Sequence, residues 1–117
     1  MTPFGARMRQ LRQARGLTLK QMAADLDVSA AYLSALEHGH RGRPSWLFIQ
    51  RVCGYFNIIW DEAEALADLA KRSHPRITID TSGLSPRATL LANELSARIA
   101  GLSDAKLRQL LKLLRED

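Results

Sequence analysis

Side chains able to bind a polar or anionic partner gather between residues 29 and 43. Hydroxyl, imidazole and guanidinium groups follow one another closely there, in Ser29, Ser34, His38, His40, Arg41 and Arg43. Serine hydroxyls both donate and accept hydrogen bonds, and guanidinium groups match the geometry of phosphate oxygens. The chemistry that this stretch predicts is therefore recognition of an anionic partner that carries hydrogen-bonding groups.

No catalytic set accompanies these groups in the sequence. There is no Cys–His or Ser–His–Asp arrangement with a nucleophile signature, and no phosphate-cradling glycine loop. His38, His40 and His74 do not form a metal-ligand set. The lone Cys53 can build neither a disulfide framework nor a zinc site, and its apolar neighbours predict a core position. We expect a binding protein that is not an enzyme and uses no metal or cofactor.

Positive charge is concentrated in the first half of the chain. The 117 residues carry a net charge of +5, and 46% of them are apolar, enough for a packed core. Residues 1–57 hold eight basic and three acidic side chains, whereas residues 58–117 hold nine of each. Such an asymmetry indicates a polyanion partner for the first half.

Membrane and export signals are not found. No apolar run approaches the roughly 18 residues that a membrane span requires. The opening MTPFGARMRQLRQ lacks the apolar stretch of a signal peptide. We therefore expect a cytoplasmic protein without a membrane partner.

Helical periodicity dominates the first 73 residues. It predicts helices over 3–15, about 18–26, 29–38, from 44 onward, and about 60–73. Thr18 and Gln21 form a capping box, Asp27 and Val28 make a tight turn, and glycines end the first and third helices. In the fourth helix we place Leu47 on the inner face, beside Phe48, Val52 and Phe56. The second and third helices thus predict a helix-turn-helix.

The second half predicts a linker and two more helices. Ile77 and Ile79 alternate with polar residues, so the linker over 74–83 has room for one short strand. Helices then follow from Ser85 to about Ala100 and onward from Ser103. The predicted fold is all-α, with a five-helix domain over 1–73, a linker over 74–83 and a C-terminal helical hairpin over 84–117.

The helix-turn-helix stretch resembles the Cro and phage-repressor type of regulators, the xenobiotic-response-element-like family. The resemblance covers about residues 4–58 and is carried by Leu17-Thr18, Ala23, Leu26, Val28-Ser29, Tyr32-Leu33-Ser34, Leu36-Glu37, Gly39 and Arg43-Pro44-Ser45. It implies a transcriptional regulator, expected to be a repressor, whose third helix enters the major groove of double-stranded DNA. Two positions depart from the family pattern: Leu19 replaces a phosphate-binding glutamine, and Asp27 replaces the turn glycine.

By resemblance, the DNA contacts fall on the second helix, the third helix and the loop after it. The candidates are Thr18, Lys20, Ser29, Ala30, Ala31, Tyr32, Ser34, Ala35, His38, His40, Arg41 and Arg43. The groove-facing side chains are short, so alanine methyls would meet thymine methyls and serines would bond base edges. With no bidentate base reader among them, much of the affinity is expected from phosphates and DNA shape. For Tyr32, a phosphate contact and simple packing are both open.

The C-terminal helices carry more leucine than one small hairpin buries. We expect a second copy to cover these positions, so that a homodimer binds a palindromic operator. Packing onto the fifth helix of the same chain is the alternative. The expected dimer contacts are Ile77, Ile79, Leu84, Leu91, Leu95, Ile99, Leu107, Leu110, Leu111 and Leu114.

Three other roles are weighed against a plain repressor. The C-terminal segment would mask a toxin if the protein were an antitoxin that regulates its own promoter. The fold would serve protein contacts alone if the protein were an adaptor, which the basic first half disfavours. As in phage-repressor-like activators, Asp25 and Asp27 would touch RNA polymerase if the protein also activated transcription.

Overall fold

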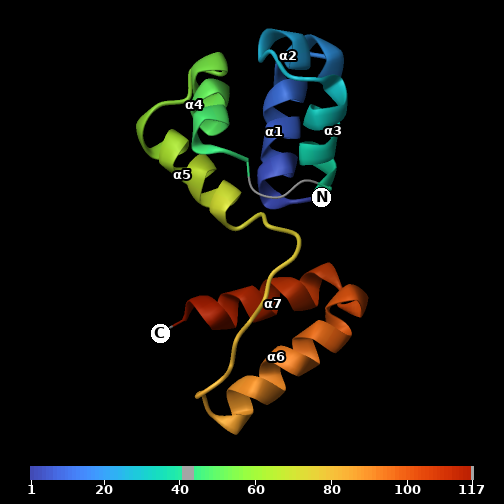
Figure 1. Cartoon of the computed structure of the whole chain (residues 1–117), viewed down its shortest axis with the longest axis vertical. Helices are drawn as coiled ribbons and strands as arrows, with labels where there is room; N and C mark the ends of the chain where they lie inside the picture. Colours follow the sequence, from blue (N-terminus) through green and yellow to red (C-terminus); the bar gives the residue numbers. More distant parts are fainter. Residues whose placement is uncertain (41–43, 117) are drawn as a thin grey trace. The chain divides into compact units, whose positions relative to one another are not determined.

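The computed structural model describes residues 1–40 and 44–116, which form two compact units, Met1–Ile77 and Thr78–Asp117 (Figure 1). The first unit contains α1 (Pro3–Ala14), α2 (Leu19–Asp25), α3 (Ala30–His38), α4 (Trp46–Tyr55) and α5 (Trp60–Lys71). The second contains α6 (Pro86–Arg98), a short 3₁₀ helix η1 (Ile99–Gly101) and α7 (Asp104–Arg115). The described residues include no strand, so the all-α prediction is confirmed for them.

Hydroxyl caps decide where most of these helices begin. In each, the side-chain oxygen of the preceding residue accepts a hydrogen bond from a backbone N–H in the first turn. The capping residues are Thr2, Thr18, Ser29, Ser45, Ser85 and Ser103. Helix α5 differs, because Ile59 precedes it and no side chain caps its start.

The core of the first unit lies between α1, α3 and α5, with α2 against α3 and α4 against α5. Its buried side chains are Phe4, Met8, Met22, Ala23, Leu26, Leu33, Leu36, Phe48, Ile49, Val52, Cys53, Phe56, Ile58, Leu66 and Ala70. The backbone N–H of Phe4 donates to the buried Ser73 hydroxyl at 2.9 Å, which ties the start of α1 to the residues after α5.

Leu47 does not lie where the sequence placed it. Its side chain is 68% exposed, whereas Phe48, Ile49, Val52 and Cys53 are buried. Those four positions form one stripe of α4 at i, i+1, i+4 and i+5, and Leu47 falls a third of a turn outside it. The expectation of an inward Leu47 is therefore wrong.

The stretch over residues 74–83, which the sequence predicts to be a linker, contains no strand either. Ile77 and Ile79 lie in an irregular stretch and are 73% and 57% exposed. A strand needs a neighbour for its backbone hydrogen bonds, and the described part of this chain supplies none. The stretch closes in a turn, where the Asp80 carboxylate accepts bonds from the Ser82 N–H and hydroxyl. These two bonds lower the pKa of Asp80 below its ordinary value.

The second unit lacks a buried core of its own. Figure 1 shows α6 and α7 diverging from η1 as two arms of a V. None of the residues described from 78 to 116 is buried, and Leu95, Leu107 and Leu110 are only half-buried. We refer to residues 86–115 as the C-terminal helix pair. Among the described residues, no helix has the length and apolar character that crossing a membrane demands.

Candidate nucleic-acid interface

The two helices of the candidate motif are held by local hydrogen bonds. The Thr18 hydroxyl accepts from the Gln21 N–H at 3.0 Å, and the Gln21 side chain accepts from the Thr18 N–H at 2.9 Å. This capping box fixes the start of α2. At its end the chain turns through Asp27, which has a φ of 57°, and the Val28 N–H donates to Ala23. Aspartate tolerates this left-handed backbone better than most residues, so the turn forms without glycine.

Helix α3 presents one face to the core and the opposite face outward. Leu33, Leu36 and Glu37 are buried. On the other side Ala30, Ala31 and His38 are exposed, and Ser34 and Ala35 are half-buried. These five positions follow one another at helical spacing, so the sequence-predicted groove residues share one surface. That surface has short side chains along most of its length.

A buried ion pair fixes α3 against α1. The Arg12 guanidinium donates to both carboxylate oxygens of Glu37, at 3.0 and 3.1 Å, and also to the Leu17 carbonyl at 3.1 Å. Glu37 is 2% exposed and the Arg12 side chain 14%. Glu37, which the sequence suggests pairs with an arginine in the fold, does so with Arg12 and thereby positions α3.

A shallow groove of about 540 Å³ separates the N-terminal ends of α3 and α4. The lining residues are Val28, Ser29, Tyr32, Ser45, Leu47, Phe48 and Arg51. Tyr32 packs edge-on against Phe48, with ring centroids 5.6 Å apart, so packing accounts for part of its role. The hydroxyl of Ser29 caps α3 by accepting from the Tyr32 N–H at 3.0 Å.

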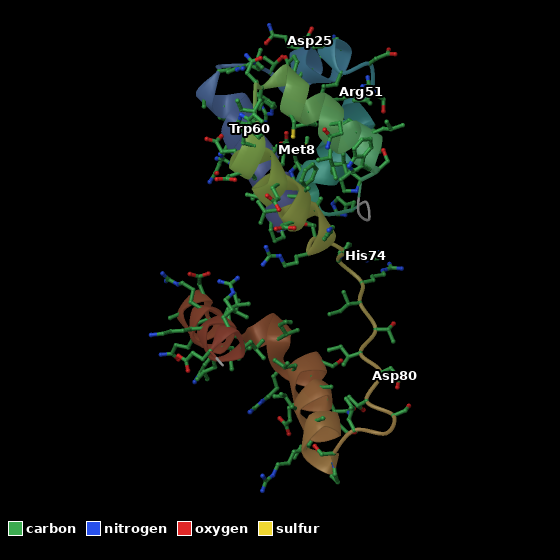
Figure 2. All side chains as sticks on the ribbon, turned by 90° about the vertical axis from the view of Figure 1, so that its left-hand side faces the viewer. Met8, Asp25, Arg51, Trp60, His74 and Asp80 are labelled. Carbon is green, nitrogen blue, oxygen red and sulfur yellow. The ribbon has the colours of Figure 1, made fainter. Side chains whose placement is uncertain are left out.

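Arg51 was missed by sequence reasoning. Arg51 lies on α4 (Figure 2). Its guanidinium donates to the Leu26 carbonyl at the turn between α2 and α3 and borders the groove. Arg51 adds positive charge beside the start of α3. The sequence could have indicated this role, because Arg51 is a basic residue on the side of α4 that faces away from the buried stripe.

Two histidines lie at the C-terminal end of α3: His38 is its last residue and His40 follows two residues later. The His38 ring nitrogen Nδ1 lies 2.8 Å from the Ser34 carbonyl, and a carbonyl only accepts, so Nδ1 carries the proton. His40 stacks on His38 with ring centroids 6.3 Å apart. Lys20 is exposed on α2. Arg41 and Arg43, the remaining candidates, lie outside the described residues.

Asp25 has a structural partner. The Tyr55 hydroxyl donates to its carboxylate at 2.6 Å, joining α2 to α4, and this bond raises the pKa of Tyr55. Arg15 donates to the Tyr55 carbonyl at 2.9 Å and lies 5.0 Å from the centre of the Phe56 ring. Asp25 therefore takes part in packing α2 against α4, whatever else it contacts.

The residues predicted to form the dimer interface are exposed or half-buried in the single chain. Leu84, Leu91, Ile99, Leu111 and Leu114 expose between 47% and 70% of their surface. Leu95, Leu107 and Leu110 are half-buried. These apolar side chains are therefore largely uncovered in the single chain.

The helix-turn-helix domain family matches residues 3–66 of the chain. The uncharacterized HTH-type transcriptional regulator RghRB of Bacillus subtilis is 36% identical over 67 residues, which are 57% of this chain and 48% of that protein. The HTH-type transcriptional repressor RghR of the same organism is 38% identical over 61 residues, 52% of this chain and 45% of that protein. The chain thus spans about half the length of the curated relatives it matches.

One solved structure aligns along most of the chain. It is the SinR protein/SinI protein complex, with 22% identity over 96% of this chain and 94% of that one. The TM-score is 0.49, which is too low to support a comparison of the two folds.

Proposed function

This chain belongs to the helix-turn-helix domain family, and on that premise we propose that it is a sequence-specific DNA-binding transcriptional repressor of the Cro and phage-repressor type. The outward face of α3 supports this proposal more than any other observation. Ala30, Ala31 and His38 contribute nothing to the core, yet the helix that carries them is capped by Ser29 and anchored by the Arg12–Glu37 pair. A rigid helix with a small-residue surface fits the width of the major groove.

The short side chains define how the helix would read DNA. Alanine methyls at 30, 31 and 35 would contact thymine methyls, and Ser34 would bond a base edge. Phosphates would be held by Lys20, by Arg51 and by the first-turn backbone N–H groups of α2 and α4 that the capping hydroxyls do not engage. We therefore expect a modest preference at each base position and a strong dependence of affinity on salt.

A second copy of the chain would supply the other half of an operator. The exposed leucines of the C-terminal helix pair fit an interface between two copies. The resulting dimer would present two α3 helices to half-sites about 34 Å apart, on a palindromic operator. Occupancy of such a site near a promoter blocks polymerase, which is the simplest route to repression.

Selection of bound duplexes from random DNA tests this function. The expected product is a palindrome, bound with an affinity that falls with salt at a log–log slope of about 0.9 per neutralised phosphate. The variant Ala31→Glu places a carboxylate on the exposed face of α3, and we expect it to lose at least tenfold in affinity while folding normally. Ala14→Glu, at an alanine of α1 that is also exposed, is the control and should bind like the wild type.

Two results would contradict the proposal. One is the recovery of no preferred sequence at low ionic strength. The other is equal DNA affinity for Ala31→Glu, Ala14→Glu and the wild type, since no duplex can then lie against α3. Co-purification of a stoichiometric second protein that releases the chain from DNA would favour the antitoxin role over the repressor.

A further inference from the structure

One side chain on the outward face of α3 is larger than its neighbours. The face consists of Ala30, Ala31, Ser34, Ala35 and His38, and of these five only His38 carries a ring. At about 100° per residue, the other four positions span about 140° of the helix circumference, and His38 falls near the middle of that span. His38 is exposed, so a molecule lying along this face meets its imidazole.

The imidazole of His38 bonds to its own helix. Nδ1 lies 2.8 Å from the carbonyl oxygen of Ser34, one turn earlier, and 3.4 Å from the Ser34 hydroxyl. The carbonyl oxygen can only accept, so Nδ1 is the protonated nitrogen of the neutral ring, and the hydroxyl adapts to this tautomer. The bond to the carbonyl therefore fixes both the direction of the ring and the position of its proton.

The second ring nitrogen, Nε2, is then an acceptor. In the neutral ring with Nδ1 protonated, Nε2 carries a lone pair and no hydrogen. This lone pair points nearly opposite to the Nδ1–H bond, and so away from the Ser34 carbonyl. His40 stacks on a face of the His38 ring, with centroids 6.3 Å apart, and does not meet its edge. His38 thus offers an acceptor and no side-chain donor to a partner of α3.

An acceptor without a donor discriminates between bases. The major-groove donors are the exocyclic amines, N6 of adenine and N4 of cytosine, whereas guanine O6 and thymine O4 are acceptors. Nε2 against either oxygen would leave two acceptors facing each other without a hydrogen bond. We propose that His38 is a specificity-determining residue, whose Nε2 accepts a hydrogen bond from the exocyclic amine of adenine or cytosine. This inference rests on the proposed function, because it requires α3 to lie in the major groove.

The position of His38 along α3 separates this contact from those of the alanines. His38 is the last residue of the helix and Ala30 is the first, so they lie about 12 Å apart along its axis. Successive bases of one DNA strand are about 3.4 Å apart. One base pair in each half-site should therefore depend on His38 and not on Ala30 or Ala31.

Selection of bound duplexes with the full chain locates that base pair. We expect His38→Ala to lose a preference of about tenfold at one position of each half-site and to keep the rest of the palindrome. His40→Ala is the matched control, because it removes a second exposed imidazole that lies beyond the end of α3. This control should alter the overall affinity at most and leave the preferred sequence unchanged.

Base analogues then identify the group that His38 contacts. At the position found, purine replaces adenine, or pyrimidin-2-one replaces cytosine, which deletes the exocyclic amine. A 7-deazapurine in the same base pair separately removes the acceptor N7. We expect amine deletion to weaken binding about tenfold more for the wild type than for His38→Ala, and loss of N7 to affect both proteins equally. Coupling of His38 to N7 in place of the amine would mean that Nε2 donates, and would overturn the proposal.

Nitrogen-15 NMR of the free protein gives a measurement without DNA. In mildly alkaline buffer, where imidazoles are neutral, the ring correlations of His38 should show a proton on Nδ1 and none on Nε2. A proton on Nε2 of the neutral ring would contradict the tautomer on which the inference depends.

The two proposals fail in different ways. If the wild type selected no sequence, the DNA-binding function would fall, and this contact with it. If the wild type selected a palindrome and His38→Ala selected the same one with the same preferences, only the role of His38 would be refuted.

Discussion

At the scale of single residues, Gly5 sets how closely α1 approaches α3. A Cβ atom at this position would lie 2.4 Å from the Leu36 carbonyl oxygen and 2.6 Å from the Glu37 carbonyl oxygen. Both are backbone atoms of α3, which cannot swing aside as a side chain can. Gly5 therefore allows the close packing that places Glu37 within reach of Arg12.

We expect Gly5→Ala to destabilise the first unit by about 1–3 kcal/mol, because the two helices must move apart. Thermal unfolding followed by circular dichroism measures the loss. Gly54→Ala is the matched control, since nothing lies within 4 Å of the Cβ that it would add near the end of α4. That variant should be neutral, or more stable by up to about 1 kcal/mol. Equal melting temperatures for the two variants would contradict this account of Gly5.

At the scale of elements, long-range side-chain bonds hold α2 and α3 in place. Arg12 joins α1 to Glu37 of α3, Arg51 reaches from α4 to the turn at Leu26, and Tyr55 joins α4 to Asp25 of α2. The Arg12–Glu37 pair is the most buried of the three. Removing one member of such a pair leaves a charge without a partner in a nearly dry site.

We expect Arg12→Ala to destabilise the first unit by about 3 kcal/mol or more, since the Glu37 carboxylate would stay buried without its cation. The double variant Arg12→Met/Glu37→Leu should recover most of the loss, because it removes both charges and keeps their volume. Urea unfolding of the wild type and both variants measures the coupling. If the double variant were as unstable as Arg12→Ala, the unpaired Glu37 charge would not be the cause of the destabilisation.

Local signals predicted the helices well and their mutual contacts poorly. The hydroxyl caps and the turn at Asp27 act within three or four residues, so a single sequence reveals them. An arginine partner for Glu37 is expected from the sequence, but the bond with Arg12 spans 25 residues, as does the contact of Arg51 with Leu26, and no local pattern indicates which residue is the partner. Leu47 was misplaced because its apolar character outweighed its position beside the buried stripe. The isolated strand at Ile77 and Ile79 failed because alternation does not supply a pairing neighbour.

At the scale of the whole molecule, the two units differ in how much they bury. Residues 1–77 enclose a core of 15 buried apolar side chains, whereas none of the described residues after 77 is buried. A helix pair with so little burial has too small a hydrophobic contribution to offset its ordering entropy. We expect it to be stable only when its exposed leucines are covered.

Leu114→Lys and Leu113→Lys form a matched test of that expectation. Both leucines are exposed, at 70% and 63%, but Leu114 lies on the stripe of α7 with Leu107, Leu110 and Leu111, and Leu113 lies outside it. We expect sedimentation to give a dimer for the wild type and Leu113→Lys, and the 13.1 kDa monomer for Leu114→Lys. A wild-type monomer at micromolar concentration would refute dimerisation through this stripe.

The exposed alanines of α3 have a consequence for engineering. Ala30 and Ala31 are exposed, and the cap and the ion pair that stabilise the helix lie at other positions. If α3 enters the major groove as proposed, glutamine, asparagine or arginine introduced at either site would add a base-reading group with little effect on stability. Under the proposed function, the helix would allow this scaffold to be retargeted to new promoters by substitution at two surface positions.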